Sequence, residues 1–221
     1  MVVQTLARIA AFGALLAFAI VPPAAAADAP IKIVALGDSL TAGFNLPANA
    51  AFPARLEKAL QQEGLAVEVT NAGVSGDTAS GGLARLDWSV PEGTEAVIVE
   101  LGANDMLRGV DPAVTRAALD AIVGRLTERR IAVLVVGMRS MPNLGIEFAQ
   151  GFEPIYPEIA AKYGALLYPF FLDGIVGESG LQQRDGMHPN AEGVERVVAG
   201  ILPTAVELVA RARQARGGNI Q

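Results

Sequence analysis

The sequence contains no cysteine in its 221 residues, and it contains a single histidine, His188. The absence of cysteine excludes disulfide bonds, thiolate zinc sites, a cysteine nucleophile and a lipidated cysteine. With one histidine, a metal site built from several imidazoles is impossible, and a mechanism that needs an imidazole base must use His188. We expect neither a metal nor another cofactor.

Basic residues are also scarce, because 17 Lys and Arg stand against 23 Asp and Glu, for a net charge of −6. A nucleic-acid-binding surface needs excess positive charge, so we expect no nucleic-acid partner. Hydrophobic residues make up 52% of the chain and charged residues 18%. That composition is typical of a globular protein, and the length allows one domain or two at most.

Residues 1–27 differ in composition from the rest of the chain. They contain one charged residue, Arg8, then the apolar run 9–21 and a segment of small residues that ends at Ala27. This order is typical of a secretory signal peptide, and we expect cleavage near Ala26 or Ala27. The apolar run is shorter than the roughly 20 residues that span a bilayer. A buried or membrane-anchoring helix is the alternative interpretation.

Cleavage would remove Arg8 and no acidic residue, so the net charge would become −7. An exported chain without cysteine suits the bacterial periplasm or the extracellular medium. No other stretch is apolar over enough residues to span a bilayer, so we expect no membrane span after cleavage. Residues 30–216 contain no internal repeat and no Ser/Gly linker, and we interpret residues 28–221 as one domain. The sequence leaves the oligomeric state open.

Short apolar segments alternate with segments of helical spacing along this domain. Most of the apolar segments are continuous, which is typical of a parallel sheet with helices on both faces. The sequence therefore predicts an α/β fold. We expect residues 71–82 to form a turn-rich loop and residues 138–150 to be irregular. The predicted strands are 31–36, 65–70, 96–101, 131–137 and 165–168, and the predicted helices are 51–63, 83–86, 111–130, 152–163 and 190–216.

Polar residues gather in four clusters, at 37–39, 73–77, 102–105 and 185–189. The first three follow the first three predicted strands, and the fourth precedes the last helix. Because the carboxyl ends of parallel strands lie along one edge of a sheet, we expect the first three clusters to meet there. Each cluster alone is explained by turns and helix caps, which favour Asp, Asn, Ser and Gly.

The four clusters together contain the groups that acyl transfer requires. A serine becomes a nucleophile beside a base, and Ser39 and His188 are the candidates. Asp185, three residues before His188, is the candidate carboxylate that orients the imidazole. The backbone N–H of Ser39, the N–H of a glycine and the Asn104 amide are candidate donors to an oxyanion. The joint pattern favours a serine hydrolase.

The same clusters resemble the four sequence blocks of the SGNH, or GDSL, hydrolases. The resemblance spans about residues 31–210 and is closest to the bacterial thioesterase I / arylesterase / lysophospholipase L1 branch. The Gly-x-Ser-x-Gly elbow of the α/β-hydrolases is absent, because Thr41 stands where its second glycine would be. The matching strings are Gly-Asp-Ser-Leu-Thr-Ala-Gly (37–43), Val-Ser-Gly-Asp-Thr (74–78), Gly-Ala-Asn-Asp (102–105) and Asp-Gly-Met-His-Pro-Asn (185–190).

The resemblance implies a three-layer α/β/α, flavodoxin-like fold with a five-stranded parallel sheet of order 2-1-3-4-5. It also implies Ser39 as nucleophile, His188 as base and Asp185 as the partner of His188. The implied oxyanion hole combines the Ser39 amide, the Gly76 amide and the Asn104 side chain. Gly73 is the nearby glycine that a turn alone would explain.

The expected reaction is hydrolysis of a carboxylic ester, aryl or acyl, through an acyl-enzyme. Acyl thioesters and lysophospholipids are further candidate substrates, so the expected partner is a small-molecule ester or lipid. An O-acetyl esterase acting on carbohydrate or peptidoglycan is the alternative enzyme, and a non-catalytic lipid- or glycan-binding module is the alternative from another class. Apolar residues after the third and fourth strands line an acyl groove or only seal the core edge: Met106, Leu107, Met141, Leu144, Ile146 and Phe148.

Overall fold

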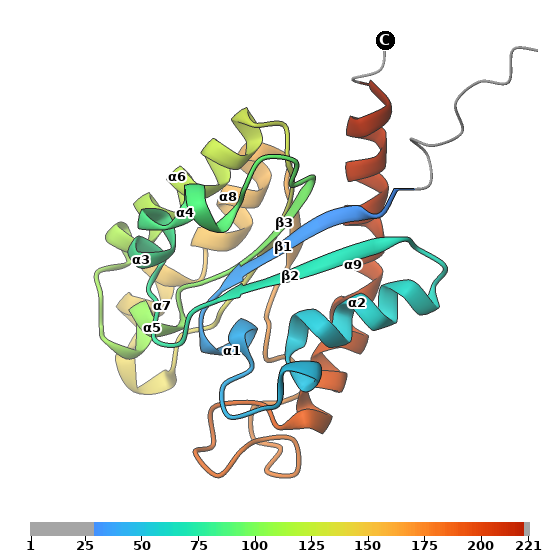
Figure 1. Ribbon diagram of the computed structural model, residues 1–221. Helices are drawn as coiled ribbons and strands as arrows, with labels where there is room; N and C mark the ends of the chain where they lie inside the picture. Colours follow the sequence, from blue (N-terminus) through green and yellow to red (C-terminus); the bar gives the residue numbers. More distant parts are fainter. Residues whose placement is uncertain (1–28, 219–221) are drawn as a thin grey trace, which may run out of the picture.

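A five-stranded parallel sheet in the order β2-β1-β3-β4-β5 organises the computed structural model, which describes residues 29–218 (Figure 1). Both the α/β class and the strand order expected from the resemblance are confirmed. The expected signal peptide, residues 1–27, lies outside the described residues. The strands are β1 (Ile31–Gly37), β2 (Val67–Gly73), β3 (Ala96–Glu100), β4 (Ala132–Val136) and β5 (Leu166–Tyr168).

Helices cover both faces of the sheet, which makes three layers. One face is covered by α2 (Phe52–Gln62) and α9 (Ala191–Gly218), which pack against each other (Figure 1). The other face carries α3 (Ala79–Ala84), α4 (Leu86–Ser89), α6 (Pro112–Glu128) and α8 (Ile155–Tyr163).

Within residues 29–218, no helix is both long and apolar enough to cross a bilayer.

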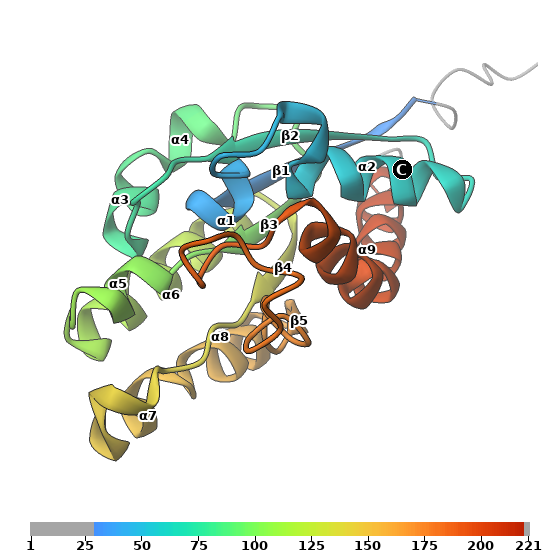
Figure 2. The same cartoon turned by 90° about the horizontal axis from the view of Figure 1, so that it is seen from below.

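Short elements lie toward the carboxyl end of the sheet. Figure 2 views this end and shows α1 beside the loop that leads into α9. This edge is where a parallel sheet presents its functional groups. The short elements are α1 (Ser39–Ala42), α5 (Ala103–Leu107), α7 (Ile146–Phe152) and the 3₁₀ turns η2 (Ala48–Ala50) and η3 (Pro142–Leu144).

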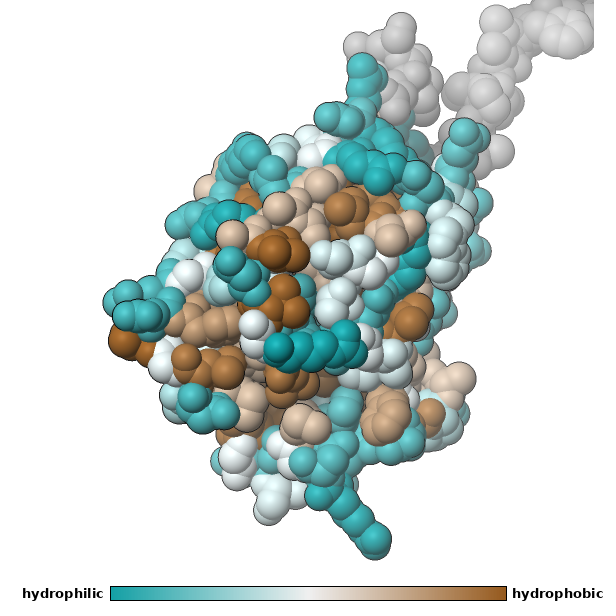
Figure 3. Space-filling model, turned by 90° about the vertical axis from the view of Figure 1, so that its left-hand side faces the viewer, coloured by the Kyte–Doolittle hydropathy of each residue, from teal (hydrophilic) through white to brown (hydrophobic). Residues whose placement is uncertain are grey.

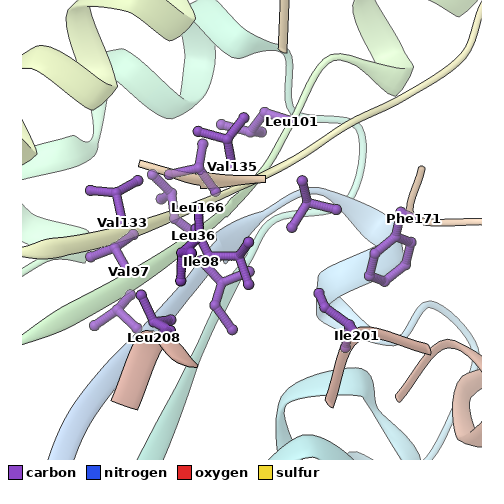
Figure 4. Close-up of a cluster of buried hydrophobic side chains, with 14 of the residues drawn as sticks. Leu36, Val97, Ile98, Leu101, Val133, Val135, Leu166, Phe171, Ile201 and Leu208 are labelled. Atoms are coloured by element: carbon purple, nitrogen blue, oxygen red, sulfur yellow. The ribbon is translucent and has the colours of Figure 1, made fainter. Parts of the chain in front are cut away.

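The core fills the space between the sheet and its two helical layers. All five residues of β3 are buried, as expected for a strand that is covered on both faces. Leu36 of β1 and Ile98 of β3 pack in one cluster with Ile201 and Leu208 of α9 (Figure 4). This packing holds the carboxyl ends of β1 and β3 rigidly beside each other.

The second strand, β2, starts two residues later than the predicted strand 65–70 and extends three residues further. Residues Asn71, Ala72 and Gly73 pair in register with Ala35, Leu36 and Gly37 of β1. Because tertiary pairing satisfies their backbone groups, these three residues are extended although Asn and Gly have low strand propensity. The expected loop 71–82 is therefore wrong at both ends, since α3 already begins at Ala79.

The expectation of an irregular segment at 138–150 is wrong in its second half, where α7 forms. Gly145 precedes this helix with φ +85°, and no side chain caps it, so the sequence carries no start signal. Packing of the fully buried Phe152 on the core stabilises the helix instead. Pro154 separates α7 from α8, which divides the single helix expected from residue 152.

Candidate active site

Ser39 is the first residue of α1, directly after the first strand of the sheet. Gly37 of that strand pairs with Gly73 of β2 on one side and with Glu100 of β3 on the other. The loops that follow these three strands therefore begin side by side. Asp38 caps α1, because its Oδ1 accepts a 2.9 Å hydrogen bond from the Leu40 amide.

The imidazole of His188 lies between the Ser39 hydroxyl and the Asp185 carboxylate. His188 Nε2 is 2.9 Å from Ser39 Oγ, and Nδ1 is 2.7 Å from Asp185 Oδ2. Ser39 and His188 are 149 residues apart in sequence, so only the fold brings them together. The three groups form one continuous hydrogen-bonded row, in the order that general-base activation of a serine requires.

Asp185 is held in its ionised form by the turn that contains it. Its Oδ1 accepts hydrogen bonds from the amides of Met187 and His188, at 2.9 and 3.0 Å. The Met187 amide is the main cause that lowers the pKa of Asp185 to about 2, and the His188 amide and side chain lower it further. The carboxylate therefore stays negative over the whole neutral range, where it can accept a proton from Nδ1.

Phe44 packs against the ring of His188, with the ring centroids 4.7 Å apart and the planes tilted by 37°. The Phe44 carbonyl accepts a 2.8 Å hydrogen bond from Gln183 Nε2, which also donates to the Pro189 carbonyl at 3.0 Å. These contacts connect the chain after α1 to the loop that carries His188. They restrict the orientation of the imidazole, and the sequence alone had not indicated them.

Asn104, in α5, donates a 3.0 Å hydrogen bond from Nδ2 to Asp38 Oδ2. Asp38 is fully buried, and burial is the main cause that raises its pKa to about 6, against the lowering effect of the Leu40 amide, Asn104 and His188. An amide nitrogen has two N–H groups. Asp38 therefore orients the Asn104 side chain and leaves one of its N–H groups for another acceptor.

Gly76 lies in the loop after β2 with φ +84°, a conformation that side-chain-bearing residues rarely adopt. Its carbonyl accepts a 2.8 Å hydrogen bond from Arg108 Nη2, just after α5. Within the described residues, its N–H donates to no backbone carbonyl. The Gly73 amide, by contrast, already donates to Asn71 Oδ1 at 2.9 Å. Of the two glycines, Gly76 thus has the freer amide.

The six expected substrate-contacting residues fall into three groups. Met106 is only 6% exposed and belongs to the hydrophobic core, which favours the alternative that it seals the core edge. Leu144 and Phe148 are partly buried and pack on the core. Leu107, Met141 and Ile146 are exposed, by 48%, 41% and 69%. Only this last group offers free apolar surface.

These apolar residues come from elements at the same end of the molecule. α5 and α7 both contact α6 there (Figures 1 and 2). On the face shown in Figure 3, hydrophobic residues reach the surface in separate patches between hydrophilic ones. A groove of about 790 Å³ lies between α6, α7 and α8, lined by Asp111, Arg116 and Glu147 among others but by neither Ser39 nor His188.

A second buried carboxyl lies directly behind the nucleophile turn. Glu100, the last residue of β3, is 1% exposed, and its Oε2 accepts a 2.8 Å hydrogen bond from Thr41 Oγ1. Its Oε1 is buried without a partner among residues 29–218. Burial raises the pKa of Glu100 well above its usual range, and the negative charge of Asp38 raises it further. The protonated form of Glu100 is therefore favoured over a wider pH range than for an exposed glutamate.

At alkaline pH, we expect Glu100→Gln to melt at a higher temperature than the wild type. At about pH 4, below the pKa of an unfolded glutamate, the two melting temperatures should be nearly equal. Because the pKa of Glu100 is higher in the folded protein than in the unfolded chain, wild-type stability falls as the pH rises between these two values. The loss is about 1.4 kcal/mol per pH unit, or roughly 3–5 °C for a domain of this size. Glutamine has the same size and cannot ionise. Thermal melts across this pH range measure the difference.

Glu92→Gln, at an exposed position, is the matched control. Its melting temperature should follow that of the wild type at every pH. A gap between Glu100→Gln and the wild type that stays constant with pH would show that Glu100 does not carry a raised pKa.

Within residues 29–218, no group of three or more His, Asp or Glu side chains is arranged to hold a metal ion. The site is built from a hydroxyl, an imidazole, carboxylates and amide donors.

The sequence analysis did not single out Glu100. Its position as the one charged residue of an otherwise apolar strand could have indicated a buried carboxyl.

Comparison with known proteins gives the family. Residues 35–196 match the model of the GDSL-like lipase/acylhydrolase family. Esterase TesA of Pseudomonas aeruginosa is 36% identical over 178 residues, which cover 80% of this chain and 89% of the relative. Thioesterase 1/protease 1/lysophospholipase L1 of Escherichia coli K12 is 38% identical over 170 residues, which cover 76% of this chain and 79% of the relative.

The fold comparison agrees with the sequence comparison. The crystal structure of AlinE4, an SGNH-hydrolase family esterase, superposes with a TM-score of 0.69 at 43% sequence identity. The match covers 80% of this chain and 96% of that one. The residues that match the family model include Ser39, Asn104 and His188. The chain therefore belongs to the GDSL-like lipase/acylhydrolase family and is a hydrolase.

Proposed function

We propose that this hydrolase is a serine esterase in which Ser39 attacks the substrate carbonyl, His188 is the general base and Asp185 orients the imidazole. The observation that carries the proposal is the hydrogen-bonded row from Ser39 Oγ through His188 to Asp185 Oδ2, with links of 2.9 and 2.7 Å. Acyl transfer needs a nucleophile within hydrogen-bond reach of a base that is itself oriented, and these distances meet that requirement.

In the acylation step, His188 Nε2 takes the Ser39 proton as Oγ bonds to the carbonyl carbon. The imidazolium that forms is stabilised by the ionised Asp185 across Nδ1. The tetrahedral intermediate collapses as the carbon–oxygen bond to the leaving group breaks, and His188 gives the proton to the departing alcohol. A thioester would react in the same way with a thiol as the leaving group. Water then repeats the sequence on the acyl-enzyme and releases the acid.

The negative oxygen of the tetrahedral intermediate needs donors that are already in place. We assign this role to the backbone N–H groups of Ser39 and Gly76 and to the second N–H of Asn104. The Ser39 amide is at the start of α1, where no intrahelical acceptor is available. The Gly76 amide donates to no backbone carbonyl within the described residues, and Asp38 orients Asn104. These three donors come from the loops after β1, β2 and β3.

The substrates we propose are carboxylic esters with an aryl or acyl group, with acyl thioesters and lysophospholipids as further candidates. Relatives named as an esterase and as a thioesterase/lysophospholipase support this class. Leu107, Met141 and Ile146 are the exposed apolar residues that we assign to contact the acyl chain, supported at the edge by Leu144 and Phe148. Apolar lining suits a hydrocarbon chain because its burial is favourable at about 25 cal/mol per Å².

A substrate panel combined with covalent labelling tests the proposed function. We expect hydrolysis of p-nitrophenyl butyrate and octanoate to exceed hydrolysis of acetylated carbohydrate or peptidoglycan at equal concentration. A fluorophosphonate probe should label one site, and mass spectrometry of the digest should place the label on Ser39. Preferred release of acetate from glycans would instead assign the chain as an O-acetyl esterase. Absence of both labelling and turnover would assign it as a binding module.

For location, we propose that residues 1–27 are a signal peptide and that residues 28–221 are the exported, single-domain enzyme in the periplasm or medium. The order of a charged start, an apolar run and small residues supports this. The intact mass of the exported protein measures the cleavage site. A mass that includes residues 1–27 would contradict the proposal.

A further inference from the structure

Arg85 is a buried arginine that touches neither Ser39 nor His188. It lies between α3 and α4 and is 7% exposed. A buried arginine is costly unless its donors are satisfied, so the acceptors that it finds indicate why it is buried. No step of the proposed mechanism uses it.

The guanidinium of Arg85 joins three segments that meet at the carboxyl edge of the sheet. Nη2 donates to the Gly37 carbonyl at 2.8 Å, at the end of β1 and two residues before Ser39. Nη1 donates to the Ala72 carbonyl at 2.8 Å, near the end of β2. Nε donates to Asp77 Oδ2 at 2.6 Å, in the residue directly after Gly76. One rigid group therefore contacts both the turn of the nucleophile and the loop of the Gly76 amide.

The loop around Asp77 is closely packed, which makes it sensitive to this contact. The Asp77 amide donates to the Val74 carbonyl at 3.1 Å, which closes the turn around Gly76. A Cβ atom at Gly81 would lie 1.9 Å from Asp77 Oδ1, so α3 approaches this carboxylate as closely as glycine allows. The side chain of Asp77 is 14% exposed, and that of Arg85 is 8% exposed. Water therefore competes little for this ion pair.

We propose that Arg85, through Asp77, is a positioning residue for ester hydrolysis. It holds the loop that presents the Gly76 amide in register with the turn that presents Ser39. The inference rests on the proposed function, because it assigns Arg85 to the alignment of two groups of that site. A planar guanidinium reaches three acceptors at fixed angles, whereas the ammonium of a lysine is a flexible point charge. Misplacement of reacting groups by about 1 Å costs about 100-fold in rate.

Two variants test the proposal by comparing kcat with KM. Arg85→Lys keeps the charge but cannot bridge Gly37, Ala72 and Asp77 at once, and we expect kcat to fall about 10–100-fold with KM nearly unchanged. Asp77→Asn keeps the size and an acceptor but removes the charge, and we expect a fall in kcat of about tenfold. The double variant should be no slower than Arg85→Lys, because the two residues act as a unit. The second-order rate of fluorophosphonate labelling should fall in parallel.

Matched controls separate positioning from general stability. Ser89→Ala removes only the 3.0 Å hydrogen bond from Arg85 Nη1 that leads away from the site, and kcat should stay at the wild-type value. Arg129→Lys changes another arginine that donates to backbone carbonyls, those of Val90 and Pro91, and should also leave kcat unchanged. Asn104→Ala provides the benchmark for a lost oxyanion donor, at about 10²–10³ in kcat. Rates are compared at a temperature at which circular dichroism shows each variant folded.

The outcomes separate this inference from the proposed function. If Ser39→Ala is inactive but Arg85→Lys and Asp77→Asn both keep wild-type kcat, the positioning role is wrong and the esterase assignment stands. If the loss is in KM alone, or if Ser89→Ala loses as much kcat as Arg85→Lys, the role is structural and the proposal is overturned. If Arg85→Lys does not fold, Asp77→Asn decides by the same criteria.

Discussion

Replacement of Ser39 by alanine should lower kcat for p-nitrophenyl butyrate by about 10⁴–10⁶, as loss of the nucleophile does in other serine hydrolases. The change removes one oxygen atom from a residue that begins a helix, where alanine is tolerated. The fold should therefore persist, with the melting temperature nearly unchanged. Steady-state kinetics and thermal melts on the same preparation measure both properties. Fluorophosphonate labelling should disappear completely.

Ser80→Ala is the control for this experiment, because Ser80 is an exposed serine on α3. It should keep wild-type kcat and full labelling. Residual activity of Ser39→Ala near the wild-type level would show that another group performs the attack. The assignment of the whole site would then fail, since His188 is positioned on Ser39 Oγ.

Replacement of His188 by alanine should lower kcat by a similar factor of about 10⁴–10⁶. His188 is the only histidine of the chain, so no second imidazole can take over its role. Added imidazole should restore part of the activity, because the change leaves a space between Ser39 and Asp185 that a small base can enter. The rate should rise with imidazole concentration and saturate. Titration of His188→Ala with imidazole measures this rescue.

Two comparisons make this result specific to a base. The double variant Ser39→Ala/His188→Ala should be no slower than either single variant, because nucleophile and base act in one step. Added imidazole should not accelerate Ser39→Ala. Full activity of His188→Ala without imidazole would contradict the assignment of His188 as the base.

The buried carboxyls show how far the site extends beyond these residues. Asp38 and Glu100 lie beneath the turn that carries Ser39, and burial raises the pKa of each. Asp38 orients Asn104, and Glu100 binds Thr41 of α1. The same edge of the sheet thus contains a partly buried base and acids that are protonated more easily than usual. Both carboxyls support the turn from its buried side, because each accepts a hydrogen bond from α1.

The fold was predictable from the sequence because its signals are local. Apolar runs over the strands and capping residues at the helices follow from the burial and the hydrogen bonding of each segment alone. Asp111 is an example, since it caps α6 as expected and precedes Pro112 at the first helical position. The extent of β2 was not predictable, because its last three residues are extended only through pairing with β1. The start of α7 was missed because no residue caps it.

The sequence by itself determined the chemistry that is available to this protein. A single histidine and no cysteine leave one route to an imidazole base and none to a thiolate, and the spacing of Asp185 and His188 places both in one turn. Only the tertiary structure decided how the groups are supported. Arg85 and Gly37 are 48 residues apart, and Thr41 and Glu100 are 59 apart. Such contacts depend on the register of neighbouring strands, which is set by the packing of the whole sheet and not by any one segment.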